Sequence, residues 1–155
     1  MIIYPLDRMD PGSWSLIPGV VNRVAMFCRK HETDTDPESI SQRVVEHFVV
    51  PEKRQTLRVW VAIQGGNLIG HCLVTVDTWC DKVIGTIVQY ESDEPLERAQ
   101  VRRAFDEIAA WAREKGATTL RILTLHKDER GLARARLFQR LYGFKPTHMV
   151  CDREL

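Results

Sequence analysis

The stretch that is most informative about the fold is residues 61–72, VAIQGGNLIGHC. It spans the end of one run rich in β-branched residues, 59–63, and the start of another, 68–76, and this composition is typical of strands. Gly65 and Gly66 separate the runs, and glycine tolerates the positive φ angles of a tight hairpin turn. The sequence therefore predicts a β-hairpin near the middle of the chain.

The chain before the hairpin predicts one short strand and two helices. Residues 2–6 form the strand, and apolar residues at helical spacing follow between positions 16 and 27. This first helix is either continuous or broken at Pro18. The second helix begins with a capping aspartate, a proline and a glutamate at 36–38 and ends before Pro51.

The chain after the hairpin continues with strands and helices. The run at 82–90 does not alternate strictly between apolar and polar residues, which indicates a strand at the centre of a sheet. The remaining elements are a helix from Pro95 to Gly116, a strand at 119–125, a helix at 131–141 with Leu137, Phe138 and Leu141 facing inward, and a last extended segment after Phe144. The order β-α-α-β-β-β-α-β-α-β predicts an α/β fold, a mixed sheet with helices on both faces.

Length and composition bound the class of protein. A chain of 155 residues with 44% hydrophobic residues is predicted to form one compact domain, 1–155. A net charge of +1 points to neither nucleic acid nor an anionic membrane as a partner. No apolar run reaches membrane-spanning length, and four scattered cysteines are typical of reduced thiols, so a cytoplasmic location is predicted.

Two cysteine–histidine pairs formally supply four zinc ligands: Cys28 with His31, and His148 with Cys151. The first pair can share one face of a helix. In a strand, the second pair would lie on opposite faces. No metal site is therefore predicted.

Three segments resemble, in order and spacing, the GCN5-related N-acetyltransferase (GNAT) superfamily. They are the hairpin at 61–72, the helix end and strand at 111–125, and the helix with its closing Gly-Phe at 135–144. The resemblance implies a GNAT-like, mostly antiparallel sheet. It also implies transfer of an acetyl group from acetyl-CoA to an amine, on either a small molecule or a protein.

The resemblance also assigns roles to particular residues. Family members hold acetyl-CoA between the fourth and fifth strands, which here implies contacts from the strand amides of Ile87, Val88 and Gln89. The pyrophosphate is expected at the start of the third helix, near Arg98 and Arg102, because helix N-termini bind anions.

A base for the amine is expected at the end of the fourth strand, where Glu91 stands. The alternative is that Glu91 is a solvated acid in the first turn of the following helix. His71 and His126 are either further residues of the same cleft or ordinary edge histidines.

The same region departs from the family pattern. The loop at the helix start, residues 96–101, reads LERAQV and lacks the glycines that allow a pyrophosphate close to the backbone. Negative charge is added nearby by four carboxylates: Glu91, Asp93, Glu94 and Glu97. Gln139 stands where many family members have a tyrosine that protonates the departing thiolate.

Two hypotheses follow from the sequence. In the first, the protein is an N-acetyltransferase that uses acetyl-CoA. In the second, it keeps the fold without the chemistry and is a binding or assembly protein, such as a subunit of a viral or other complex, forming a homo-oligomer or a larger assembly. Whether the chain is an enzyme stays open at the level of sequence.

Overall fold

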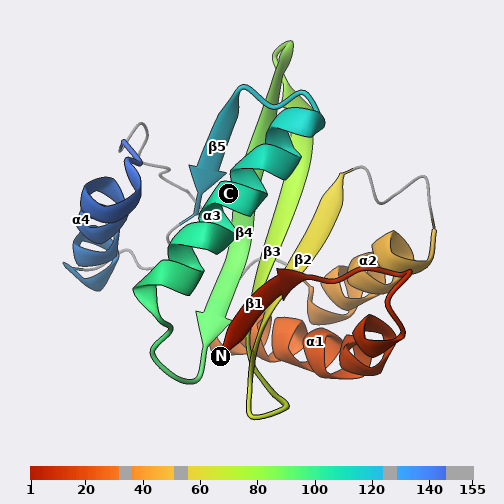
Figure 1. The fold of residues 1–155 in the computed structure, drawn as a ribbon. Helices are drawn as coiled ribbons and strands as arrows, with labels where there is room; N and C mark the ends of the chain where they lie inside the picture. The colour runs from red at the N-terminus through yellow and green to blue at the C-terminus, as the bar shows by residue number, and fades with distance from the viewer. Residues whose placement is uncertain (32–35, 51–55, 124–128, 146–155) are drawn as a thin grey trace. The chain divides into compact units, whose positions relative to one another are not determined.

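The computed structural model describes residues 1–31, 36–50, 56–123 and 129–145 (Figure 1). The chain divides into two compact units, Met1–Leu123 and Thr124–Leu155. The first unit contains the whole described sheet, and the second contains one described helix, α4 (Glu129–Tyr142). None of the described helices is long and apolar enough to cross a membrane.

The first unit is built on a five-stranded sheet in the order β1-β2-β3-β4-β5. Its strands are β1 (Ile2–Pro5), β2 (Leu57–Gln64), β3 (Asn67–Trp79), β4 (Lys82–Ser92) and β5 (Thr119–Ile122). The first four strands pair antiparallel, and β5 pairs parallel to β4. This confirms a mixed, mostly antiparallel sheet with the 82–90 strand inside it.

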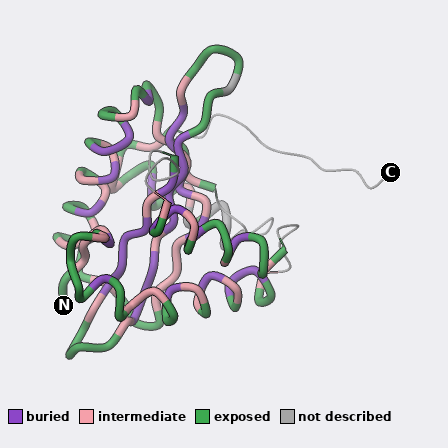
Figure 2. The backbone as a smooth tube through the Cα atoms, turned by 90° about the vertical axis from the view of Figure 1, so that its right-hand side faces the viewer, coloured by how far each residue is buried: buried purple, intermediate pink, exposed green. Residues whose placement is uncertain are grey.

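The sheet is covered on both faces by helices α1 (Pro11–Lys30), α2 (Pro37–Val49) and α3 (Arg98–Glu114). Helices α1 and α2 share one core cluster with Val59 and Val61 of β2. Trp60, between them, points to the other face and packs edge-on against Trp111 of α3, with ring centroids 5.7 Å apart. Figure 2 shows the resulting buried stretches along the strands.

The predicted hairpin joins β2 to β3. Gln64 pairs with Asn67, and both intervening glycines have positive φ, 57° at Gly65 and 81° at Gly66. Positive φ at both turn positions matches the right-handed twist of the strands, which explains why this sequence turns in two residues.

Helix α1 runs without a break through Pro18, so the broken-helix alternative was wrong. Proline removes the hydrogen bond to the carbonyl of Trp14, four residues earlier. Both Pro18 and Trp14 lie on the exposed side of the helix, where water can take over that bond. The N-terminus is capped by Asp10, whose carboxylate accepts hydrogen bonds from the N–H groups of Gly12 and Ser13.

Helix α3 begins at Arg98, and the predicted start at Pro95 was wrong. The residues before Arg98 are held by the sheet instead. The Asp93 N–H donates to the Ile69 carbonyl at 2.9 Å, and the Ser92 hydroxyl donates to the Glu94 carbonyl. These bonds extend the strand connection and delay the first helical turn.

The last helix also differs from prediction. Leu137 of α4 is 40% exposed, so its inward orientation was wrong, whereas Phe138 is buried and Leu141 is half-buried. Phe138 packs against Phe144, with ring centroids 6.0 Å apart. The predicted end of the strand at 124–125 lies outside the described residues. The final extended segment predicted after Phe144 also lies outside them, except for Lys145.

The close approach of α3 to β4 generates a stability prediction. A Cβ atom at Gly85 would lie 3.0 Å from the Ala112 Cβ and 3.3 Å from the Leu120 Cδ1. We expect Gly85→Ala to lower the free energy of unfolding in urea by about 1–3 kcal/mol through overpacking. Ala112→Gly should recover part of this loss in the double variant, with the exposed Ala110→Gly as the control for helix propensity. Strictly additive effects would contradict the contact.

Candidate active site

The main feature of the candidate site is that β4 outruns its neighbour β5 (Figure 1). The β4–β5 pairing covers Ile84 to Ile87, and the last bond runs from the Leu123 N–H to the Ile87 carbonyl at 3.1 Å. Strand β4 continues to Ser92, paired with β3 alone among the described strands. Among the described residues, one edge of β4 therefore has no strand partner after Ile87.

A β-bulge lies at the point where the two strands part. In the β3–β4 register, Leu73 faces Gln89 and Val74 faces Ile87, which leaves Val88 as the extra residue. A bulge bends its strand and increases the local twist, and this one lies just where the described pairing with β5 ends. The consecutive residues Ile87, Val88 and Gln89 therefore lie where the described pairing with β5 ends.

The start of α3 supplies unpaired backbone donors. The first intrahelical bond runs from the Val101 N–H to the Glu97 carbonyl, so the N–H groups of Arg98, Ala99 and Gln100 precede the helical ladder. The Glu97 side chain makes no capping bond to them. Such a helix end attracts anions.

Two arginines stand at the same helix end. Arg98 and Arg102 are exposed, one turn apart, and neither has an ion-pair partner among the described residues. Arg103 differs, because its guanidinium is bound to the Glu107 carboxylate at 3.0 Å. The two unpaired guanidinium groups are therefore available to phosphate.

Most of the acidic residues of the junction are held by partners elsewhere in the fold. Arg23 of α1 grips both carboxylate oxygens of Asp93, at 2.6 and 2.9 Å, and also donates to the Ile69 carbonyl. The hydrogen bond from Arg23 lowers the pKa of Asp93. Glu94 accepts a bond from the Gln64 amide at 2.8 Å. The Arg23 ion pair offsets the charge of Asp93, whereas the Gln64 amide binds Glu94 without offsetting its charge.

Glu91 lies on β4, opposite His71 in the register, and its side chain is 20% exposed. The Lys30 ammonium at the end of α1 binds its carboxylate at 2.5 Å, and the His31 Nε2 lies 4.0 Å from the same oxygen. The first turn of α3 contains no acidic residue, so the interpretation of Glu91 as a helix-start acid was wrong.

A buried polar chain lies behind Glu91. The Gln89 amide donates to the Cys28 sulfur at 3.2 Å, and its oxygen lies 3.4 Å from the His71 Nε2. Burial lowers the pKa of His71 to about 4, so the ring is neutral near pH 7. The Gln89 side chain thus serves the α1 interface, and only its backbone is left for the opening.

The basic residues of α1 are the part of the site that sequence reasoning missed. Arg23 and Lys30 are seven residues apart, which is two helical turns and therefore one face. That spacing was a usable signal, but only the folded chain places this face against the end of β4.

The remaining candidates lie in the second unit or outside the described residues. Gln139 is exposed on α4, in the second unit. His126, His148 and Cys151 lie outside the described residues. Within the described ranges, no group of three His, Cys, Asp or Glu side chains could hold a metal ion.

Comparison with solved structures identifies the fold. An aminoglycoside N-acetyltransferase, AAC(6')-Iy in complex with CoA, superposes with a TM-score of 0.66 at 13% identity, covering 99% of this chain and 93% of its own. An aminoglycoside 6'-N-acetyltransferase from Acinetobacter haemolyticus gives 0.64 at 13%, covering 100% and 98%. The chain has the GNAT fold.

A further GNAT-fold neighbour carries an amine ligand. It is an aminoglycoside acetyltransferase from an uncultured soil metagenomic sample in complex with sisomicin, with a TM-score of 0.57 at 16% identity, covering 98% of this chain and 95% of its own. No protein-family model matches the sequence, and no curated protein matches it significantly. The GNAT fold predicted from three short segments is confirmed by structure alone.

The buried His71 generates a pH prediction. An unfolded histidine takes up its proton near pH 6.5, whereas His71 in the folded protein does so only near pH 4. Between these values the unfolded state binds more protons, so the free energy of unfolding should fall by roughly 3 kcal/mol as the pH drops from 6.5 to 4. Urea titrations should show this slope and its loss in His71→Gln. An NMR titration of the His71 ring with a midpoint near 6.5 would refute it.

Proposed function

We propose that the protein is a divergent GNAT-superfamily acetyltransferase that transfers an acetyl group from acetyl-CoA to a primary amine of a small molecule. The observation that carries the proposal is the open edge of β4 after Ile87, in a chain whose next helix begins with uncapped N–H groups. The fold and the acetyltransferase neighbours support it.

The residues present fit acetyl-CoA. Amide groups along the open edge of β4 can pair with the amides of a pantetheine arm, as strands pair with extended ligands. The N–H groups at the start of α3, with Arg98 and Arg102, suit a pyrophosphate. Acetyl-CoA supplies the activated thioester.

Glu91 is proposed to accept the proton of the attacking amine, directly or through water. The amine nitrogen forms the new bond to the acetyl carbon while the carbon–sulfur bond breaks. Lys30 orients the Glu91 carboxylate through their ion pair. The Gln139 amide has no proton that titrates near neutral pH, so solvent is proposed to protonate the departing thiolate. No covalent link to the enzyme is needed.

The proposed acceptor is a small amine. The neighbour in complex with sisomicin supports this class over a protein amine. The alternative is a non-catalytic binding or assembly protein, which a failure to bind CoA would favour. The cytoplasmic location stays a prediction.

Cofactor binding tests the proposal directly. Calorimetric titration should detect saturable binding of CoA, and the double variant Arg98→Ala/Arg102→Ala should weaken it by roughly tenfold or more through lost phosphate contacts. Arg103→Ala is the matched control, because its guanidinium is already engaged by Glu107.

Absence of binding up to millimolar CoA would refute the acetyltransferase and favour the assembly protein. That hypothesis predicts a stable oligomer or complex in size-exclusion chromatography with light scattering. Equal weakening by all three arginine changes would place the phosphates elsewhere on the helix.

The role of Glu91 is tested by kinetics, with sisomicin as the trial amine. We expect Glu91→Gln to lower kcat by about 10²-fold or more while the Kd for CoA stays unchanged, because a general base acts on the chemical step. Glu94→Gln, on the same junction, is the control. Turnover unaltered in the Glu91 variant would remove this residue as the base.

A further inference from the structure

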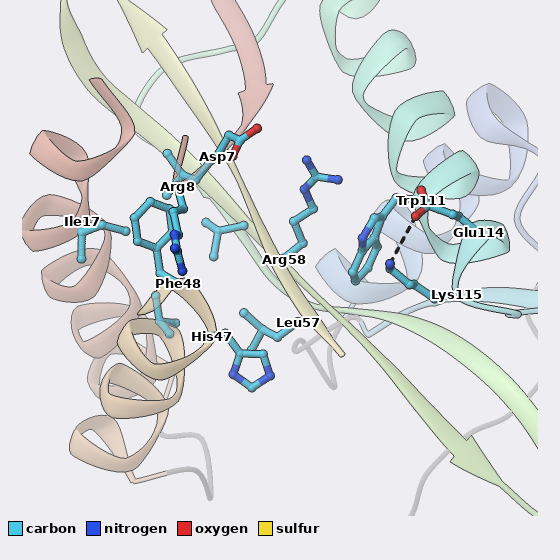
Figure 3. A pocket seen from close by; sticks show the side chains of 13 residues that line it. Asp7, Arg8, Ile17, His47, Phe48, Leu57, Arg58, Trp111, Glu114 and Lys115 are labelled. Atoms are coloured by element: carbon cyan, nitrogen blue, oxygen red, sulfur yellow. Dashed lines mark hydrogen bonds and ion pairs between the residues drawn. The ribbon is translucent and has the colours of Figure 1, made fainter. Parts of the chain in front are cut away.

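A second opening lies beside the start of β2 (Figure 3). We call it the edge pocket; it has a volume of about 200 Å³. Its apolar lining includes Ile17, Phe48, Leu57, Val59 and Trp111. Trp111 lies 13 residues beyond Arg98 on α3, a distance of about 20 Å along the helix at 1.5 Å per residue. The edge pocket is therefore separate from the candidate active site.

The edge pocket lies where the antiparallel pairing of β1 with β2 stops short of the first residues of β2. The last contact between them runs from the Leu6 N–H to the Val59 carbonyl at 2.8 Å. Leu57 lies beyond it at the start of β2, and the Thr56 carbonyl next to it accepts from the Val76 N–H of β3. Backbone groups alternate in direction along a strand, so those of Leu57 face the edge pocket. The pocket thus contains a backbone N–H donor.

The charged groups of the edge pocket are not balanced. Its two carboxylates are engaged, Glu114 by Lys115 at 3.2 Å and Asp7 by the Met9 N–H at 2.9 Å. Arg8 and Arg58 have no ion-pair partner among the described residues. Because the Met9 N–H is neutral, Asp7 keeps its negative charge, and the two arginines still leave the described lining with a net positive charge.

Two further contacts hold these groups in place. The Arg58 guanidinium stacks over the Trp60 ring, 5.6 Å from its centroid, and Figure 3 shows the Arg58 side chain beside Trp111. Both ring nitrogens of His47 are already used, by the Arg43 carbonyl and the Thr56 hydroxyl, each at 2.9 Å. The available donors are thus guanidinium and backbone groups.

We propose that the edge pocket binds a small amphipathic monocarboxylate, such as an aromatic acid, through Arg8 and Arg58. Cavities of about 150 Å³ accept benzene, so one ring with a short acid fits the volume. A planar guanidinium matches a carboxylate, and the aromatic lining matches a ring. A phosphate dianion fits less well, because Asp7 and Glu114 lie in the same lining.

The test uses phenylacetate as the probe and the full chain. Titration followed by ¹H–¹⁵N NMR should show saturable shifts at the Trp111 indole, whereas neutral phenylacetamide should bind at least tenfold more weakly. Arg58→Met and Arg8→Met should each weaken phenylacetate by about tenfold, the loss expected for one charged hydrogen-bonding group. Arg29→Met, exposed on α1, is the control and should change nothing.

A gain of affinity gives a second, independent readout. Glu114→Gln frees the Lys115 ammonium and should tighten phenylacetate several-fold. Equal binding of the acid and its amide, loss of affinity in the Arg29 variant, or displacement of the acid by equimolar inorganic phosphate would each overturn the proposal. CoA binding should be the same in all these variants, so failure here leaves the proposed acetyl transfer untouched.

Discussion

The pairing of β4 is the constraint on which the rest of the site depends. Up to Ile87 the strand is bonded on both sides, and beyond it only β3 remains as a described partner. A buried backbone edge without partners is unfavourable, so such an edge persists where water or a ligand satisfies it. The bulge at Val88 fixes where this change occurs. The opening that results lies between the end of β4 and β5, the edge strand of the described sheet.

Helix α1 allows an acidic chain segment to lie beside that opening. Its Arg23 and Lys30 reach Asp93 and Glu91, and the Gln89 amide contacts its Cys28 sulfur. These contacts join α1 to three alternate residues at and just after the end of β4: Gln89, Glu91 and Asp93. Two of the four carboxylates in the segment that appeared least suited to an anionic cofactor are therefore paired with cations, while Arg98 and Arg102 keep their charges unpaired.

The sequence was a reliable guide wherever local physics decided the outcome. The two-glycine turn at Gly65, the Asp36 cap of α2 and the central position of β4 were all predicted, because each depends on a few neighbouring residues. Prediction failed where distant contacts won. Helix α3 starts three residues after the predicted position because Asp93 is bonded to β3. Helix α1 continues through Pro18 because this proline lies on the solvent-exposed side of the helix, where water can bind the freed carbonyl.

By itself, the sequence determined the order of the elements, the hairpin and the residues that flank the opening. The three GNAT-like segments sufficed for the fold because hydrophobic periodicity and glycine placement are local properties. Tertiary structure alone decided which charges remain free. Glu91 and Asp93 meet Lys30 and Arg23 across about 60 to 70 residues of chain, and no local pattern specifies such pairs. The charge of the site depends on which side chains the sheet brings within a few ångströms, and folding sets those distances.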